Sequence, residues 1–150
     1  MKKYNDMAFK SCNDVKMLAL CIYGEARGEG IEGMLAVGSV VCNRARQKQK
    51  TIKDICLEPK QFSCFNAGDP NREVLEGLCL NWADYIHTNK ELRASFWVAY
   101  GLTEKYLSSN VGDANHYHAD TVSPAWSKAM VKVKQIKRHV FWWDANYAKK

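Results

Sequence analysis

The sequence predicts a mainly α (α+β) fold in one domain that covers residues 1–150. Its 150 residues are 47% hydrophobic and 25% charged, which suffices for a single buried core. Several stretches repeat apolar residues at helical spacing, and Asn, Asp, Gly or Pro stands where they begin or end. A late segment rich in aromatic residues and histidine lacks this spacing. We therefore expect several helices with a small β-hairpin or irregular β segment.

The first two helices are predicted on either side of Gly28 and Gly30. A helix over 13–27 begins at Asn13, a favoured N-cap residue, and ends at the two glycines. A second helix over 31–47 has a basic last turn, which the helix dipole favours. The apolar residues at helical spacing are Val15, Leu18, Ala19, Ile22 and Ala26 in the first helix, and Met34, Val37, Val41 and Ala45 in the second.

The remaining elements follow capping and turn signals. Helices are predicted where an N-cap residue precedes an apolar stripe, and strands where aromatic and β-branched residues cluster. In chain order they are a short helix between Thr51 and Pro59, a loop or small β-hairpin over 60–69, a helix from Asp69 to Ile86, a helix over about 91–106, a short strand at 115–118 and a strand-like tail over 136–144.

The charge of the chain favours a polyanionic partner. The net charge is +6 at pH 7, which suits nucleic acid, an anionic membrane or an anionic cell-wall polymer. No apolar run approaches the roughly 18 residues that span a bilayer, so we expect no membrane insertion. The start "MKKYND" has no apolar core behind its lysines, so no signal peptide is expected. Nucleotide-binding glycine motifs are missing, and no cofactor is predicted.

Six cysteines occur without any Cys-x-x-Cys pair. Several fall on apolar helix faces, where a free cysteine behaves as a small hydrophobic residue. We therefore expect buried free thiols in a reducing compartment rather than a disulfide framework. The six are Cys12, Cys21, Cys42, Cys56, Cys64 and Cys79.

The stretch "CIYGEARGEG", residues 21–30, places an acid at the end of an apolar helix. At helical spacing Glu25 projects close to Cys21 and Ile22, so it lies along the apolar face. A carboxyl group partly withdrawn from water favours its protonated form, which a general acid needs. The alternative is a helix-end salt bridge between Glu25 and Arg27 or another cation.

Two further segments carry side chains suited to binding. "QFSCFN", residues 61–66, combines an amide, a hydroxyl and two aromatic rings, which suits a sugar or peptide, or else forms an ordinary loop. In "NHYHA", residues 115–119, His116 and His118 share one side of an extended segment. They could bind a metal ion with Asp120 or His139, or line a polar groove with Tyr117. No His-Glu-x-x-His or Cys-x-x-Cys motif supports a metal, so none is predicted.

Taken in order, these segments resemble the cell-wall hydrolase family of spore cortex-lytic germination enzymes. The matching stretches are "YGEARGE", "VCNRAR", "TIKDICLEPKQFSCFN", "ANHYHADTVSPAW" and "IKRHVFW", which together cover about residues 14–142. The resemblance implies a lysozyme-like fold and the activity of a peptidoglycan lytic transglycosylase. Such an enzyme cleaves the β-1,4 bond between MurNAc and GlcNAc and leaves 1,6-anhydro-muramic ends.

The resemblance also implies roles for individual residues. Glu25, the first acid of "EARGE", corresponds to the catalytic general acid/base. Two positions depart from the family pattern: Lys137 stands where glycine is usual, and Asn115 where threonine is usual. The other matched site residues are Gln61, Phe62 and Ser63, expected beside the substrate groove, and His116, Tyr117 and His118, expected to contact the glycan or brace the site.

Three alternatives remain open from the residues. A hydrolytic muramidase would need a second carboxylate, for which Glu29 is the candidate. A zinc-dependent amidase would use His116, His118 and His139. A non-catalytic basic module for glycan or nucleic acid would use tryptophans, most of which helical spacing assigns to the core instead. These are Trp82, Trp97, Trp126, Trp142 and Trp143.

The resemblance and the charge together predict the setting. We expect a monomer that binds peptidoglycan glycan strands and no nucleic acid. Without a signal peptide, the chain would stay in the cytoplasm until released, as in a phage endolysin, or be the mature domain of an exported germination enzyme. In both settings it degrades the cell wall.

Overall fold

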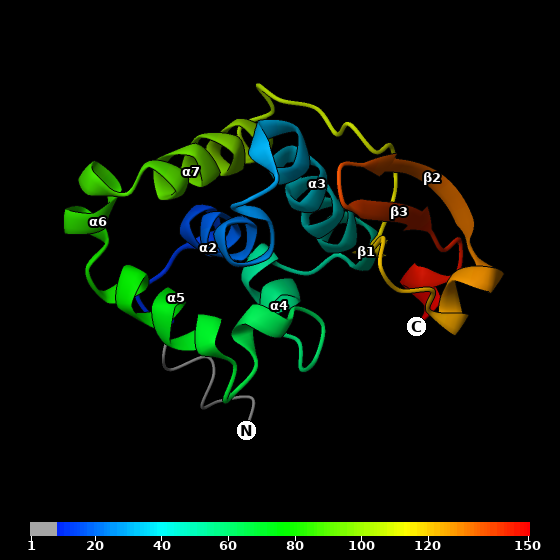
Figure 1. Cartoon of the computed structure of the whole chain (residues 1–150), viewed down its shortest axis with the longest axis horizontal. Coiled ribbons are helices and arrows are strands. Elements are labelled where there is room, and N and C mark those ends of the chain that lie inside the picture. The colour runs from blue at the N-terminus through cyan, green and yellow to red at the C-terminus, as the bar shows by residue number, and fades with distance from the viewer. Residues whose placement is uncertain (1–8) are drawn as a thin grey trace.

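The computed structural model describes residues 9–150, so the N-terminal "MKKYND" lies outside the described part. Most of the chain is helical, and a small sheet lies at one end of the molecule (Figure 1), which confirms the predicted mainly α (α+β) fold. The helices are α2 (Asp14–Ala26), α3 (Gly30–Lys48), α4 (Ile52–Cys56), α5 (Pro70–Leu80), α6 (Trp82–Thr88) and α7 (Lys90–Thr103). The strands are β1 (His116–Ala119), β2 (Val131–Ile136) and β3 (His139–Trp143), and 3-10 helices span Ser63–Phe65, Ala125–Ala129 and Tyr147–Lys149.

Helix α2 is the central element of the fold. Asn13 is its N-cap as predicted, because the side chain accepts a hydrogen bond of 2.9 Å from the Lys16 amide. Every residue from Met17 to Tyr23 is buried, so α2 is enclosed on all sides rather than along one stripe. Its neighbours are α3, α4, α5 and α7 (Figure 1). Glu25 therefore lies at the end of the most buried helix.

The predicted helix from Asp69 to Ile86 is divided into two. The start is as expected, since the Asp69 side chain accepts from the Asn71 amide. Asn81 leaves helical geometry, with φ −119° and ψ 35°, and both its amide groups bond to the Gly77 carbonyl. The side-chain amide thus competes with the helical hydrogen-bond ladder at this point and separates α5 from α6.

Residues 60–69, left open as a loop or hairpin, form turns around the 3-10 helix Ser63–Phe65. This segment packs against the C-terminal end of α2. A Cβ atom at Gly24 would lie 2.7 Å from both Cβ and Sγ of Cys64, so only glycine allows this approach. The close contact determines which groups can reach Glu25.

The sheet is antiparallel with strand order β1-β3-β2. In the register, Tyr117 pairs with Phe141 and His118 with Val140. Side chains alternate along β1, so Tyr117 points to one face while His116 and His118 point to the other. Strand β2 was not predicted, although the alternation of valine and lysine over 131–134 is a strand signal.

The prediction for the cysteines was wrong for one pair. Cys12 and Cys79 form a disulfide that joins the segment before α2 to α5. Their separation of 67 residues left no local signal for the pairing. The remaining four are free as expected, and three of them are buried: Cys21, Cys56 and Cys64.

Most of the tryptophans lie toward the surface of the described residues 9–150. Trp82 is half-buried and packs against the core as expected, whereas Trp97 is 58% exposed and Trp126 and Trp143 are each 39% exposed, so the assignment of most tryptophans to the core was wrong. Within the same residues, no helix is both long and apolar enough to cross a membrane.

Candidate active site

Glu25 lies where α2, the 3-10 helix Ser63–Phe65 and β1 meet. Its side chain is half-buried, and each carboxyl oxygen accepts one hydrogen bond. The Tyr117 hydroxyl donates to Oε1 at 2.5 Å, and the Cys64 backbone amide donates to Oε2 at 3.3 Å. Arg27 does not pair with Glu25, since it donates to the Tyr23 carbonyl and to Asn71 instead. The predicted salt-bridge alternative is therefore wrong.

Tyr117 connects the sheet to Glu25. Its ring packs against His139 at 5.0 Å and against Phe141 at 5.6 Å between centroids, which holds the hydroxyl in place. Burial, followed by the nearby Glu25 charge, raises the pKa of Tyr117 above its ordinary value. The phenol therefore stays protonated and serves as a hydrogen-bond donor to the carboxyl group.

Glu29, the candidate second acid, is held in an ion pair. It is 6% exposed and accepts hydrogen bonds from Nε of Arg138 at 2.9 Å, from Nη2, and from the Arg138 backbone amide at 3.3 Å. Burial alone would raise the pKa of Glu29, but the hydrogen bonds and charge of Arg138 outweigh it and lower the pKa. Glu29 thus links the α2–α3 connection to the β2–β3 turn.

The two histidines of "NHYHA" lie on the face of the sheet opposite to Tyr117. His116 and His118 both pack against Trp126, at 5.3 and 5.6 Å between centroids, and His118 also stacks on Trp142. The predicted common side for the two histidines is confirmed.

The histidines of the zinc alternative do not converge on one point. His139 pairs with Ala119 and packs on Tyr117, so it lies on the other face from His116 and His118. Within residues 9–150, no three side chains of His, Cys, Asp or Glu form a group that could hold a metal ion.

The "QFS" residues are divided between surface and core. Gln61 is exposed and accepts from Nη1 of Arg44 at 3.2 Å. Phe62 is 1% exposed and packs under the Arg44 guanidinium, so its contribution is to packing rather than direct contact with a ligand. Ser63 is exposed at the start of the 3-10 helix whose Cys64 amide reaches Glu25.

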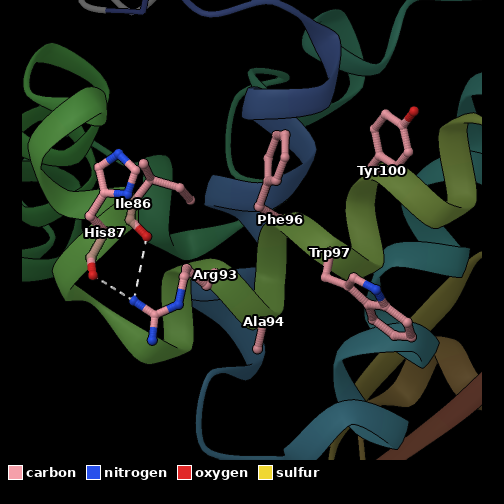
Figure 2. A pocket seen from close by; sticks show the side chains of 7 residues that line it. All are labelled: Ile86, His87, Arg93, Ala94, Phe96, Trp97 and Tyr100. Atoms are coloured by element: carbon pink, nitrogen blue, oxygen red, sulfur yellow. Dashed lines mark hydrogen bonds between the residues drawn. The ribbon is translucent and has the colours of Figure 1, made fainter.

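A cavity of about 550 Å³ lies between α6 and α7 (Figure 2), and its lining includes none of the site residues described above. Its lining residues are Ile86, His87, Arg93, Ala94, Phe96, Trp97 and Tyr100. Arg93 is occupied there by the backbone carbonyls of Ile86 and His87. The described lining carries no carboxyl group, so this cavity offers no general acid.

The sequence reasoning missed Gly24, Arg44 and Arg138. Gly24 stands in the quoted motif, and its signal was a glycine directly before the acid. Arg44 stands in "VCNRAR", but nothing local indicated that it would be buried, at 5% exposed. Arg138 is 109 residues from Glu29, so the pairing had no signal in the sequence.

The chain matches the sequence model of a protein family described as Cell Wall Hydrolase. The match covers residues 28–142 and begins just after Glu25. Among curated relatives, the spore cortex-lytic enzyme of Oceanobacillus iheyensis is 28% identical over 137 residues, which is 87% of this chain and 42% of the relative. The enzyme of the same name from Bacillus subtilis is 26% identical over 136 residues, or 87% of this chain and 38% of the relative. The chain thus spans about two fifths of the length of these relatives.

Two solved structures share the fold. The catalytic domain of the Bacillus cereus SleB protein is 25% identical with a TM-score of 0.59, over 87% of this chain and 89% of that one. The catalytic domain of the germination-specific lytic transglycosylase SleB from Bacillus anthracis is 24% identical, also with a TM-score of 0.59, over 87% of this chain and 93% of that one.

Proposed function

The chain belongs to the cell wall hydrolase family, and from this premise we propose that it degrades peptidoglycan as a lytic transglycosylase. The bond cleaved is the β-1,4 linkage between MurNAc and GlcNAc, and Glu25 is the single general acid/base. The observation that carries the proposal is the geometry of Glu25, half-buried with one donor on each oxygen. The two donors fix the orientation of the carboxyl group, which general acid/base catalysis at a bound sugar requires.

The reaction needs one carboxyl group used twice. Protonated Glu25 gives its proton to the glycosidic oxygen as the bond to C1 of the muramic residue breaks. The C6 hydroxyl of the same residue attacks C1, and the Glu25 carboxylate takes the hydroxyl proton. The products are a 1,6-anhydro-muramic end and a free GlcNAc hydroxyl, and no water is consumed. The Cys64 contact is long at 3.3 Å, so Oε2 can still carry the transferred proton.

The ion pair of Glu29 favours this mechanism over hydrolysis. A hydrolytic muramidase needs a second carboxylate that is free to act as base or nucleophile. Glu29 is instead buried and bonded three times to Arg138, so moving it to a substrate would break those bonds. Held by Arg138, Glu29 joins the α2–α3 connection to the β2–β3 turn and does not act on the substrate.

The other predicted site residues position Glu25, contact the glycan or brace the sheet. Tyr117 positions Glu25, and the exposed Gln61 and Ser63 contact the glycan beside it. His116 and His118 act from the far face of β1, by bracing the strand or by binding branches of the substrate. Since the curated relatives are named for the spore cortex, cortex peptidoglycan is the substrate to test first. We propose that the enzyme acts at the cell wall as a monomer.

The test is a digest of purified peptidoglycan with the wild type and with Glu25→Gln, followed by mass spectrometry of the soluble fragments. We expect anhydro-muramic ends from the wild type and at least a thousandfold less product from the variant, about 4 kcal/mol in barrier. Thermal unfolding should stay close to the wild type, since the Gln oxygen can accept from the Cys64 amide while its NH2 group donates to the Tyr117 hydroxyl oxygen. Glu32→Gln, at an exposed acid of α3, is the matched control. Reducing muramic ends in the wild-type digest would mean that the enzyme hydrolyses the bond instead of acting as a transglycosylase. Full activity of Glu25→Gln would mean that Glu25 is not the general acid/base.

A further inference from the structure

A second cavity, of about 460 Å³, lies against Gln61 and His116. His116 and Tyr117 point to opposite faces of β1, so the cavity is separated from Glu25 by this edge strand. The polar and charged side chains that line the cavity are those of Lys48, Glu58, Gln61, His116, Tyr147 and Lys150. The elements that position Glu25 therefore also position this pocket.

Arg44 lies directly behind the pocket lining. It is 5% exposed, donates from Nε to the Asn115 carbonyl at 2.6 Å and from Nη1 to Gln61, and packs against the Tyr147 ring. All of these partners are neutral. Within residues 9–150, no carboxylate lies within 4.0 Å of its guanidinium. Buried arginines are usually paired with an acid, so this one leaves an uncompensated positive charge behind the pocket.

The lysines of the lining add to this charge. The Lys48 ammonium lies 4.3 Å from the centre of the Tyr147 ring and has no carboxylate partner among the described residues. Glu58 is the acid of the lining and is paired with Lys50 at 3.2 Å. Lys150 is paired with Asp144. The two pairs cancel, which leaves Lys48 and Arg44 as the net charge at the pocket.

His116 contributes a neutral polar group. Burial, followed by the charge of Arg44, lowers the pKa of His116 to about 4, so the ring is uncharged at neutral pH. Asn115 Oδ1 accepts from the Asp144 amide, so it is an acceptor toward the ring too, and Nδ1 of His116 carries the proton. Its Nε2 is then free to accept a hydrogen bond, for example from an amide N–H.

We propose that this pocket binds a carboxylate of the peptide that branches from the muramic residue, a proposal that rests on the proposed peptidoglycan substrate. The net charge suits a carboxylate, while Gln61 and Nε2 of His116 suit the adjacent peptide groups. A ligand that reaches both Glu25 and the pocket must pass around the edge strand β1, and a flexible branch of the cleaved sugar can take this path. A phosphate of an anionic wall polymer carries the same charge chemistry and is the competing source.

The first test removes the Lys48 charge. Lys48→Gln is compared with Lys90→Gln, which removes one exposed charge at the start of α7. Each is assayed on peptidoglycan with intact peptides and on the same glycan after an amidase has removed them. We expect Lys48→Gln to raise the apparent KM about fivefold on the peptide-bearing glycan, with kcat unchanged. On the stripped glycan it should behave like the control.

Every other outcome of this comparison would overturn one of the two proposals. An equal loss on both substrates, or no loss on either, overturns the proposal. An inactive wild type would instead overturn the proposed function, and binding then tests the pocket by itself. In an NMR titration of the wild-type protein, a stem tripeptide should shift the His116 ring and the Gln61 side-chain amide, and Lys48→Gln should weaken that binding. Shifts with inorganic phosphate but not with the tripeptide would assign the pocket to phosphate and overturn the carboxylate.

Discussion

Glu25 was identified from its own helix, but the groups that bind it come from distant parts of the chain. The Cys64 amide is 39 residues away and the Tyr117 hydroxyl 92 residues away. Each contact orients one oxygen of the carboxyl group. At the scale of a single residue, the helix turn presents the acid and two other segments hold it in position.

The pH dependence of stability should report the Glu29–Arg138 pair. Because Arg138 lowers the pKa of Glu29 in the folded state, the pair stabilises the protein above the ordinary glutamate pKa of about 4.3. That contribution is lost as pH falls through the lower, folded-state value. Glu29→Gln should therefore cost about 1–2 kcal/mol at pH 7, since Arg138 is largely solvent-exposed.

The measurement is urea unfolding of the wild type and Glu29→Gln between pH 7 and pH 3. We expect the difference between the two proteins to shrink below about pH 4. Glu32→Gln, at the exposed acid in the first turn of α3, should show no such trend. A difference that stays constant over this range would mean that the pair does not contribute through its charge.

Among the elements, the β2–β3 hairpin explains why glycine is favoured at the position that Lys137 occupies. Ile136 pairs with His139, so Lys137 and Arg138 form a two-residue loop, and Lys137 has φ +51°. A first loop position with positive φ favours glycine, because a Cβ atom is strained there. The same turn carries Arg138 to Glu29, so its geometry matters beyond the hairpin.

Replacing Lys137 with glycine should stabilise the protein by about 0.5–1 kcal/mol. The gain is the relief of left-handed strain, reduced by the greater freedom of glycine in the unfolded chain. Urea unfolding measures it. Lys134→Gly, in the middle of β2, is the matched control and should destabilise, since glycine weakens a strand interior. An unchanged or lower stability for Lys137→Gly would contradict the strain argument.

At the scale of the whole molecule, the net charge of +6 suits the proposed anionic polymer. The uncompensated Arg44 and Lys48 make part of this charge local to one pocket. The rest is spread over the surface and acts only through long-range attraction, which salt screens.

The activity should therefore fall as ionic strength rises. Between about 0.05 and 0.5 M NaCl the Debye length falls from over 10 Å to about 4 Å, and kcat/KM on insoluble peptidoglycan should fall about tenfold. Unfolding measured at both salt concentrations controls for stability. A flat profile would mean that surface charge does not assist binding.

The sequence by itself determined the helices, their caps at Asn13, Thr51 and Asp69, and the acid at the end of α2. These features depend on contacts within one or two helical turns, where residue type and spacing suffice. It also predicted that His116 and His118 share a face, because strand alternation is local. The division at Asn81 was missed although its cause is local.

Only the tertiary structure decided which distant groups meet. The Cys12–Cys79 disulfide, the Tyr117 and Cys64 contacts to Glu25, the Glu29–Arg138 pair and the buried Arg44 all join residues far apart in the chain. Such contacts depend on how helices and sheet pack, and packing is a property of the assembled core. The acid could thus be predicted from its own turn, whereas its surroundings required the fold.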